Sequence, residues 1–438
     1  MKTILLVPTE IGVGLTSACL GLIYALECQG IKAGFLKPFS QELQPEADRT
    51  TALYRHLFKH ETVEPITYAA LTERLKNDEN DELLEDAVRL HREISKHHDI
   101  IIVEGVLPNG RDPFATELNA NLAKALDAKV IIVSNADINN PVKTASKVDN
   151  QFRFFGGASG ERTAGVLFMR TKGLPEDSAQ IPVTLDPSLR LISDTNQFVS
   201  KIQTTHPMIG KDCMPVIGLV PFSNTLSVPR MSDLAAHISA EWINQGEAAQ
   251  RRVLHSSLIA SNIEHEMHKF VAGELIISGS DRVDVLLASS LASSNGIPLA
   301  GLVLTEHQAP SAQALEFCQA AMKNGLPILH TKLSTFETAQ QLLNLSNEIP
   351  VDDTERAEQV TRFVASHINA EWLTQLISDT HKPRLSPSAF RHELVQKSIA
   401  AKKRIVLPEG DEPRTVQAAA ICQSRGIAHC VLLAKPEA

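Results

Sequence analysis

Three features are absent from this sequence of 438 residues. No run approaches the ~18 consecutive apolar residues that a membrane span needs, so we expect no membrane partner. No block of basic residues occurs and the formal net charge is -9, which argues against nucleic acid as a partner. The six cysteines form no C-x-x-C pair, as is typical of reduced thiols in a cytosolic protein.

The residues before Pro8 include too few apolar positions for a signal peptide. Together with the reduced cysteines, this predicts a cytoplasmic protein. What the chain does have is 43% hydrophobic residues, which is enough to build sizeable cores. A chain of this length is expected to divide into about two to four domains.

Short apolar runs alternate with helical stretches through residues 1–225. The runs are 3–7, 33–38, 99–105, 129–135, 165–170 and 215–222. They lack the alternation of apolar and polar residues that marks a half-exposed sheet, which favours parallel strands covered on both faces. We therefore predict a doubly wound, P-loop-like α/β domain.

The pattern changes after residue 225 and predicts three further regions. Residues 226–355 combine strands and helices in a second, smaller α/β domain. Residues 356–388 form a helical connector and a proline-bearing linker. Residues 389–438 follow the order strand, loop, helix and strand, which is the opening βαβ unit of a third α/β domain.

Two segments of the chain are nearly the same. AAHISAEWINQ at 235–245 and ASHINAEWLTQ at 365–375 agree at seven of eleven positions. In each, an isoleucine stands four residues before the tryptophan, Trp242 or Trp372. This spacing predicts two amphipathic helices that pack at domain edges.

The first strand leads into a loop of small residues and then a helix, the frame of a phosphate-binding loop. Such a loop needs glycines whose backbone N–H groups face phosphates and a threonine for Mg²⁺, here Gly12, Gly14 and Thr16. The lysine that stabilises a transferring phosphoryl group is replaced by Leu15. We therefore expect no hydrolysis. A loop that binds a nucleotide or another anion and a purely structural loop remain equal alternatives.

Two further motifs carry weaker signals. In SDRVD at 280–284, Arg282 can clamp an anion, or Ser280 or Asp281 can cap the following helix. HEMH at 265–268 lacks zinc-binding spacing, because only one residue separates its glutamate from the second histidine. We predict no metal site.

The segment RIVLPEGDEPRTVQAAA at 404–420 resembles the opening of the catalytic domain of phosphate acetyltransferases, and RLSPSAFRHEL before it is similar to their linker. The whole chain resembles the N-terminal portion of the long, three-domain bacterial form of these enzymes. In that family the first domain is similar to dethiobiotin synthetase and cobyric acid synthase. The second is the DRTGG domain, named for its motif; at the matching position this sequence reads SDRVD instead.

The resemblance to dethiobiotin synthetase implies roles for several residues. Lys37 matches a lysine at the phosphate and substrate site, although a solvated lysine at a strand end is equally compatible with the pattern. Glu104 matches a carboxylate near Mg²⁺, and Asp48 is a weaker candidate ligand. The candidate cofactor-binding residues are Thr9, Gly12, Gly14, Thr16, Lys37 and Glu104.

The family interconverts acetyl-CoA and phosphate with acetyl phosphate and CoA, in acetate metabolism. The resemblance implies that the N-terminal domains serve regulation and assembly in a homo-oligomer, with pyruvate, NADH or a nucleotide as effectors. The serine, arginine and aspartate of its chemistry lie later in the catalytic domain, so we expect this chain to be truncated and inactive, with CoA or acetyl-CoA bound only by the missing part. The rival hypotheses are an ATP-dependent enzyme of the dethiobiotin-synthetase type and a purely structural oligomerisation scaffold.

Overall fold

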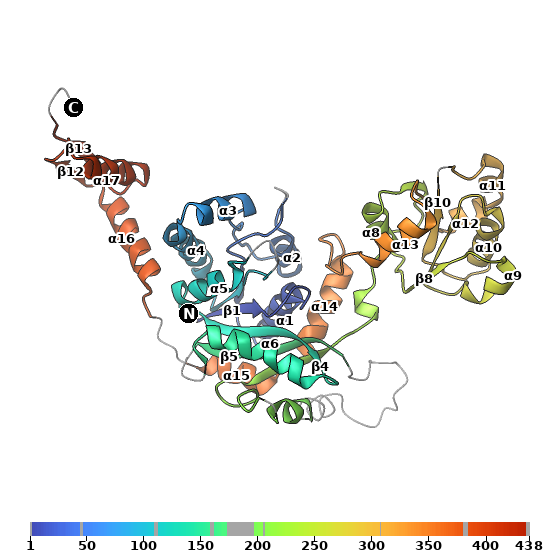
Figure 1. Cartoon of the computed structure of the whole chain (residues 1–438), viewed down its shortest axis with the longest axis horizontal. Coiled ribbons are helices and arrows are strands. Elements are labelled where there is room, and N and C mark those ends of the chain that lie inside the picture. Colours follow the sequence, from blue (N-terminus) through green and yellow to red (C-terminus); the bar gives the residue numbers. More distant parts are fainter. Residues whose placement is uncertain are drawn as a thin grey trace. The chain divides into compact units, whose positions relative to one another are not determined.

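The chain forms two compact units (Figure 1). Unit 1 comprises Met1–Phe222 and Thr354–Ala438, and unit 2, Ser223–Asp353, is inserted between those two segments in the sequence. Within the described ranges, no helix combines the length and the apolar character needed to cross a membrane. The structure is a computed structural model that describes residues 2–43, 47–108, 113–157, 162–172, 197–204, 206–306, 308–379 and 384–434.

The described part of unit 1 is built on a six-stranded sheet with the order β2-β3-β1-β4-β5-β6, in which every neighbouring pair is parallel. Because parallel neighbours need crossover connections, helices cover both faces. The predicted doubly wound α/β fold is confirmed. The strands are β1 (Lys2–Pro8), β2 (Ala33–Leu36), β3 (Ile100–Glu104), β4 (Lys129–Asp137), β5 (Thr163–Lys172) and β6 (Val216–Pro221).

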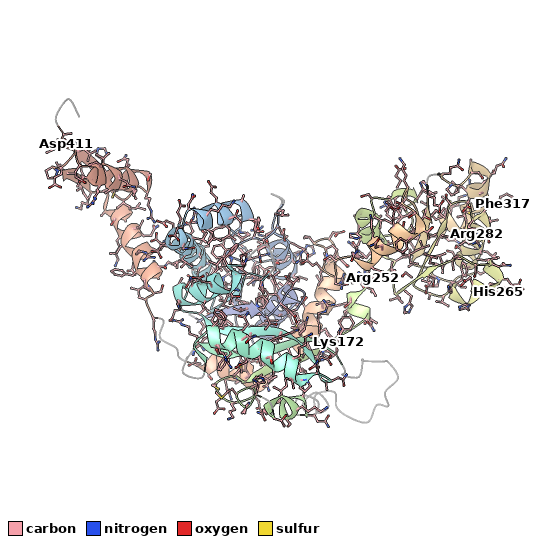
Figure 2. All side chains as sticks on the ribbon, viewed as in Figure 1. Lys172, Arg252, His265, Arg282, Phe317 and Asp411 are labelled. Atoms are coloured by element: carbon pink, nitrogen blue, oxygen red, sulfur yellow. The ribbon has the colours of Figure 1, made fainter. Side chains whose placement is uncertain are left out.

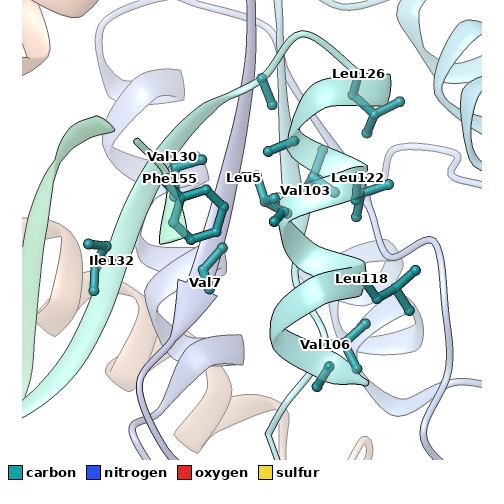
Figure 3. Packing of buried hydrophobic residues seen from close by; sticks show 14 of the residues in the cluster. Leu5, Val7, Val103, Val106, Leu118, Leu122, Leu126, Val130, Ile132 and Phe155 are labelled. Atoms are coloured by element: carbon teal, nitrogen blue, oxygen red, sulfur yellow. The ribbon is translucent and has the colours of Figure 1, made fainter. Parts of the chain in front are cut away.

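The core of unit 1 lies between this sheet and its helices. Figure 3 shows Leu118 and Leu122 of one helix beside Leu5 and Val103 of the sheet. The four-residue spacing of the two leucines places them on one side of that helix. On this face pack α4 (Asn80–Ser95), α5 (Ala115–Ala125) and α6 (Pro141–Phe154). The other helices of the first segment are α1 (Leu15–Cys28), α2 (Arg49–Phe58) and α3 (Tyr68–Lys76).

The predicted connector, 356–388, contains two helices that belong to unit 1. Helix α14 (Thr354–Ser366) lies so close to α1 that a Cβ on Gly21 would come 2.4 Å from Val364 Cγ1. Helix α15 (Ala370–Ser378) is tied to β5, because Trp372 Nε1 donates to Ala164 O at 3.2 Å. The connector is thus a layer of unit 1, while residues 380–383 of the predicted linker lie outside the described residues.

Unit 2 has a smaller sheet, described here as five strands in the order β7-β11-β10-β9-β8. Its neighbours are parallel except for β7, which runs antiparallel to β11. Two apolar clusters cover its two faces. The strands are β7 (Glu241–Asn244), β8 (His255–Leu258), β9 (Glu274–Gly279), β10 (Gly301–Thr305) and β11 (Ile328–His330), and the helices are α8 (Met231–His237), α9 (Ile263–Glu266), α10 (Val283–Ser294), α11 (Ala312–Phe317), α12 (Gln319–Lys323) and α13 (Thr335–Leu343).

The two similar segments fold differently: the helix predicted at 235–245 ends at His237, the last residue of α8, and the prediction is wrong for the rest of the segment. Asn369 caps α15 by accepting a hydrogen bond from Trp372 N at 2.9 Å. The matching residue, Ser239, adopts the left-handed conformation with φ 49°, and no helix starts there. Asn244 then donates to two carbonyls of unit 2 and fixes β7 at the sheet edge. The difference between the two structures thus lies at one matching position, where Asn369 caps a helix and Ser239 adopts a left-handed turn conformation.

The last described segment has the predicted order of strand, loop, helix and strand, preceded by a helix, α16, that the sequence pattern did not predict. Strands β12 and β13 pair in parallel. Helix α16 packs on α4, where Arg391 forms ion pairs with Asp81 and Glu85 at 2.8 and 2.9 Å. Ile405 and Val406 of β12 remain exposed. The elements are α16 (Pro387–Ala401), β12 (Arg404–Leu407), α17 (Pro413–Ser424) and β13 (His429–Leu432).

Candidate functional site

The loop between β1 and α1 keeps the backbone shape that its glycines predict. Gly12 and Gly14 have φ of 76° and 80°, a region that favours glycine. Gly14 is the N-cap of α1 and therefore has no side chain to occupy the first N–H groups of the helix. Leu15 is only 4% exposed and belongs to the apolar core. The position of the missing lysine is a packing position, so Leu15 contributes no charge to this loop.

Thr9 and Gly12 tie this loop to neighbouring strands. Thr9 Oγ1 donates to Ser134 Oγ at 3.0 Å, and its backbone N–H donates to a carbonyl of β4. The carbonyl of Gly12 accepts a hydrogen bond from Arg170 Nη1 at 3.3 Å. These contacts hold the loop from the side of β4 and β5, away from the residues described next.

Three charged side chains meet under the start of α1. Lys37 follows β2, Glu104 ends β3, and Asp48 caps α2. Lys37 Nζ lies 2.7 Å from Asp48 Oδ2 and 3.5 Å from Glu104 Oε1. The three residues are 9%, 3% and 5% exposed, respectively. We call them the ion cluster. Parallel strands bring their carboxyl ends to one edge, which is why residues so distant in sequence meet here.

Hydroxyl groups complete the surroundings of the ion cluster. Thr16 Oγ1 lies 3.1 Å from Thr50 Oγ1 and 3.5 Å from Glu104 Oε2. Thr50 Oγ1 donates to Glu104 Oε1 at 3.3 Å, and Ser40 Oγ donates to Asp48 Oδ2 at 3.1 Å. Three of the six predicted site residues therefore meet here, together with Asp48. Sequence reasoning missed Thr50, although its place two residues after Asp48 is a signal.

Burial and charge act against each other in the ion cluster. Burial alone would lower the pKa of Lys37, but Glu104 and Asp48 outweigh it and raise that pKa. Burial would raise the pKa of Asp48, yet Lys37 and several hydrogen bonds bring it below its usual range. Burial raises the pKa of Glu104, and Lys37 offsets this only in part. The cluster thus holds a close Lys37–Asp48 ion pair and a third group, Glu104, whose carboxyl pKa lies above its usual range.

A cavity of about 490 Å³ adjoins the other side of the loop. We call it the basic cavity. Its charged lining has two acids, Glu10 and Asp137, and four cations, Lys143, Lys147, Arg170 and Lys172. Lys147 is paired with Glu10, and the Arg170 guanidinium carbon lies 5.2 Å from the centre of the Phe222 ring. Asn135 also lines the cavity, and its buried Oδ1 has no hydrogen-bond partner among the described residues.

Sequence reasoning did not predict the basic cavity. Its signal was the pair of cations Arg170 and Lys172 at the end of a predicted strand, the edge where ligands of α/β proteins bind. Lys172, the last residue of β5, is labelled in Figure 2. The volume falls within the range of about 300–1,000 Å³ that is typical of small-molecule sites.

Of the two predicted roles of the SDRVD turn in unit 2, helix capping is contradicted and the anion clamp stays a prediction. Arg282, labelled in Figure 2, binds Asp284 Oδ2 at 2.7 Å and donates to Ser261 O at 2.9 Å. Its guanidinium is therefore engaged with the protein's own acceptors. Arg282 itself is the N-cap of α10, and no side chain caps that helix, so capping by Ser280 or Asp281 is wrong. Across the described residues, no cluster of histidine, cysteine and acidic side chains is arranged to hold a metal ion.

Comparison with protein families places three domains along the chain. A model described as an AAA domain matches residues 2–230, which is more than half of the sequence. The chain belongs to the family of this AAA domain. A DRTGG domain matches residues 233–345, and a phosphate acetyl/butaryl transferase domain matches residues 389–438.

Curated relatives confirm the predicted resemblance. The chain is 68% identical over 438 residues to a phosphate acetyltransferase of Acinetobacter baylyi. The aligned region covers 100% of this chain and 61% of the relative. Phosphate acetyltransferases of Pseudomonas aeruginosa and Escherichia coli are 41% and 36% identical, again over 61% of their own length. The chain thus spans about three fifths of the curated relatives that it matches.

Solved structures share less with this chain. MinD of Aquifex aeolicus is 15% identical, with 51% of this chain and 83% of that chain covered and a TM-score of 0.29. The CBS and DRTGG domains of a Clostridium perfringens pyrophosphatase are 18% identical, with 30% and 50% covered and a TM-score of 0.24. Scores this low support no inference about function.

Proposed function

We propose that the protein is a cytoplasmic phosphate acetyltransferase in which unit 1 binds a small anionic effector without hydrolysing it. The effector would be a nucleotide or a metabolite such as pyruvate or NADH, and its binding would bias acetyl transfer. The names of the curated relatives and the match of residues 389–438 support the acetyltransferase part. CoA, acetyl-CoA and phosphate are accordingly its proposed substrates, and no catalytic residue is proposed among those described.

The basic cavity is the observation that carries the effector part of the proposal. It adjoins Gly12 of the phosphate loop and has four cations against two acids. One of those cations, Lys147, is already paired with Glu10. The remaining excess of positive charge favours an anion.

Hydrolysis finds no support in the same region. The lysine position is the buried Leu15, and the ammonium group of Lys37, the predicted phosphate-site lysine, is bound to Asp48 and Glu104. Phosphoryl transfer depends on positive charge placed at the transferring group. This disfavours the rival hypothesis of an ATP-dependent enzyme. A Leu15→Lys variant should remain without steady-state ATPase activity, because Leu15 lies in the core.

Binding can be measured by calorimetry and thermal shift with pyrophosphate, ADP, ATP, pyruvate and NADH. A ligand that binds the native state raises its melting temperature by mass action. We expect at least one of these anions to do so, and Lys143→Ala combined with Lys172→Ala to weaken its binding at least tenfold. Lys124→Ala, an exposed lysine on α5, is the matched control. No shift with any anion, or equal binding by the double variant, contradicts the proposal.

The second candidate function is an oligomerisation scaffold. The exposed apolar side chains of β12 and α17 favour it, because such residues are usually covered by a partner surface (Ile405, Val406, Val416 and Ile421). We propose a homo-oligomer. Sedimentation of the purified protein should show association that Val406→Glu weakens, and a monomer across the micromolar range contradicts this part.

A further inference from the structure

Phosphate loops that process nucleotides hold Mg²⁺ with the threonine after the loop and an acidic residue from a neighbouring strand. The corresponding oxygens in unit 1 belong to Thr16, Glu104 and Asp48. All three residues lie in or beside the ion cluster. Whether these residues fit a divalent cation depends on what already lies between them.

The Lys37 ammonium lies between them. Its Nζ is 2.7 Å from Asp48 and 3.5 Å from Glu104, so it contacts both candidate carboxylates at once. The remaining oxygens are also engaged. Thr50 and Thr16 approach the two oxygens of Glu104, and Thr51 N and Thr51 Oγ1 donate to Asp48 Oδ1, each at 3.1 Å.

Charge and space both oppose a second cation. Mg²⁺ binds oxygens at about 2.0–2.1 Å in a nearly octahedral shell and gives up its water reluctantly. It would have to enter beside a buried ammonium that already contacts both candidate carboxylates. Like charges a few ångströms apart repel strongly in such a site. The residues therefore do not fit Mg²⁺ while Lys37 keeps its position.

We propose that Lys37 is an internal cation that takes the place of the divalent ion in this loop. The ion cluster then binds no divalent cation in the native protein, and removing the ammonium group turns Asp48, Glu104 and Thr16 into a divalent-cation site. If the proposed effector is also correct, its binding does not require Mg²⁺. This Mg²⁺-independence of effector binding rests on the proposed function, whereas the role of Lys37 as an internal cation does not.

The test compares Mn²⁺ binding by the wild-type chain and by Lys37→Met, using electron paramagnetic resonance of free Mn²⁺ in the absence of any anionic ligand. We expect no specific binding by the wild type at millimolar Mn²⁺. Lys37→Met should bind Mn²⁺ at least tenfold more tightly and gain several degrees of melting temperature with Mg²⁺, because a ligand selective for the native state stabilises it. Adding Asp48→Asn should abolish both gains.

The matched control is Lys397→Met, which removes an ammonium group 2.8 Å from Glu393 on an exposed helix face and should gain no Mn²⁺ site. Wild-type Mn²⁺ binding that Glu104→Gln abolishes would overturn the proposal. So would a folded Lys37→Met variant that binds no Mn²⁺. If that variant folds only when Mg²⁺ is present, the proposal is supported. If it never folds, the wild-type titration decides. Because no anion is present, failure here is distinct from failure of the proposed effector site.

Discussion

The two units are both mainly parallel sheets covered by helices, yet they bury their charges in different places. Unit 1 places its ion cluster at the carboxyl ends of β2 and β3. Unit 2 has hydroxyl groups at the matching edge, where Thr305 contacts Thr335 at 2.7 Å. Apart from Glu274 at the start of β9, its buried charged residues Arg230 and Asp353 lie near the two ends of its chain segment. A buried charge is thus a sign of a ligand site only when it stands at the ligand edge of the sheet.

The charges of unit 2 form a boundary cluster that joins its first and last residues. Arg230 Nη2 lies 2.7 Å from Asp233 Oδ1 and 2.9 Å from Asp352 Oδ2. Arg252 Nη2 donates to Asp353 Oδ1 at 2.7 Å, and Asp353 is only 2% exposed. These pairs hold the start and the end of unit 2 together, a structural role that needs no ligand.

The largest effect is expected from breaking the ion cluster. Lys37→Met leaves buried carboxyl groups without their cation, and removal of one partner from a buried pair costs about 3–5 kcal/mol. Urea unfolding with hydrogen exchange should assign this loss to unit 1. Arg282→Met, which breaks the exposed pair with Asp284, should cost under about 1 kcal/mol. Equal losses of unfolding free energy for Lys37→Met and Arg282→Met would contradict the view that unit 1 depends on its buried ion cluster more than unit 2 depends on this exposed pair.

A smaller loss is expected from the boundary cluster. In Arg230→Met, Asp233 loses its charged partner while Arg252 still holds Asp353, so we expect a cost of about 1.5–3 kcal/mol, that of lost hydrogen bonds to charged groups. Hydrogen exchange should increase in unit 2 and stay unchanged in β1 to β6. Faster exchange confined to the sheet of unit 1 would contradict this assignment.

The third test uses pH and concerns unit 1. Burial, with a smaller effect of Arg92, lowers the pKa of His91 on α4 to about 4. The unfolded chain therefore takes up this proton at a higher pH than the folded chain, and stability is lost as pH falls below about 6.5. At pH 5 this loss is about 2 kcal/mol. Urea midpoints at pH 7 and pH 5 should differ less for His91→Gln, and an unchanged difference would exclude His91 as the cause.

The smallest effect concerns the two similar segments, one in each unit. Asn369→Ala removes the cap of α15 and should destabilise unit 1 by about 1 kcal/mol. At the matching position of unit 2, asparagine tolerates the left-handed conformation of Ser239, so Ser239→Asn should change stability by less than about 0.5 kcal/mol. A larger loss of stability for Ser239→Asn would show that the conformation at this position does not explain why the two segments fold differently.

Local pattern predicted the strands of unit 1 well, because fully buried parallel strands are continuous apolar runs such as 99–105. Local pattern failed for most of 235–245, because two apolar residues four positions apart lie on one side of a strand as well as on one side of a helix. The spacing of Ile238 and Trp242 therefore does not distinguish the two structures. The outcome depends on Ser239 and on the carbonyls that Asn244 reaches, which are distant in sequence. Only the packed unit supplies them.

The site was predicted in part, and for a definite reason. Thr16 came from the phosphate-loop motif, and Lys37 and Glu104 came from the resemblance. The alternative that Lys37 is a solvated lysine is wrong, because it is buried. The basic cavity was missed. It depends on the conformation of Arg170, with φ 48°, and on Phe222 after a distant strand, neither of which a sequence pattern encodes.

Unit 1 is made of two segments separated by all of unit 2, and this sets an order during synthesis on the ribosome. Chains emerge from their N-terminus and domains fold as units. The six strands of unit 1 leave the ribosome long before α15, whose carbonyls at Leu376 and Ile377 accept hydrogen bonds from Lys2. Unit 2 is complete while the sheet of unit 1 still lacks this layer. Any quality control that acts on the nascent chain therefore meets an unfinished first unit beside a finished second one.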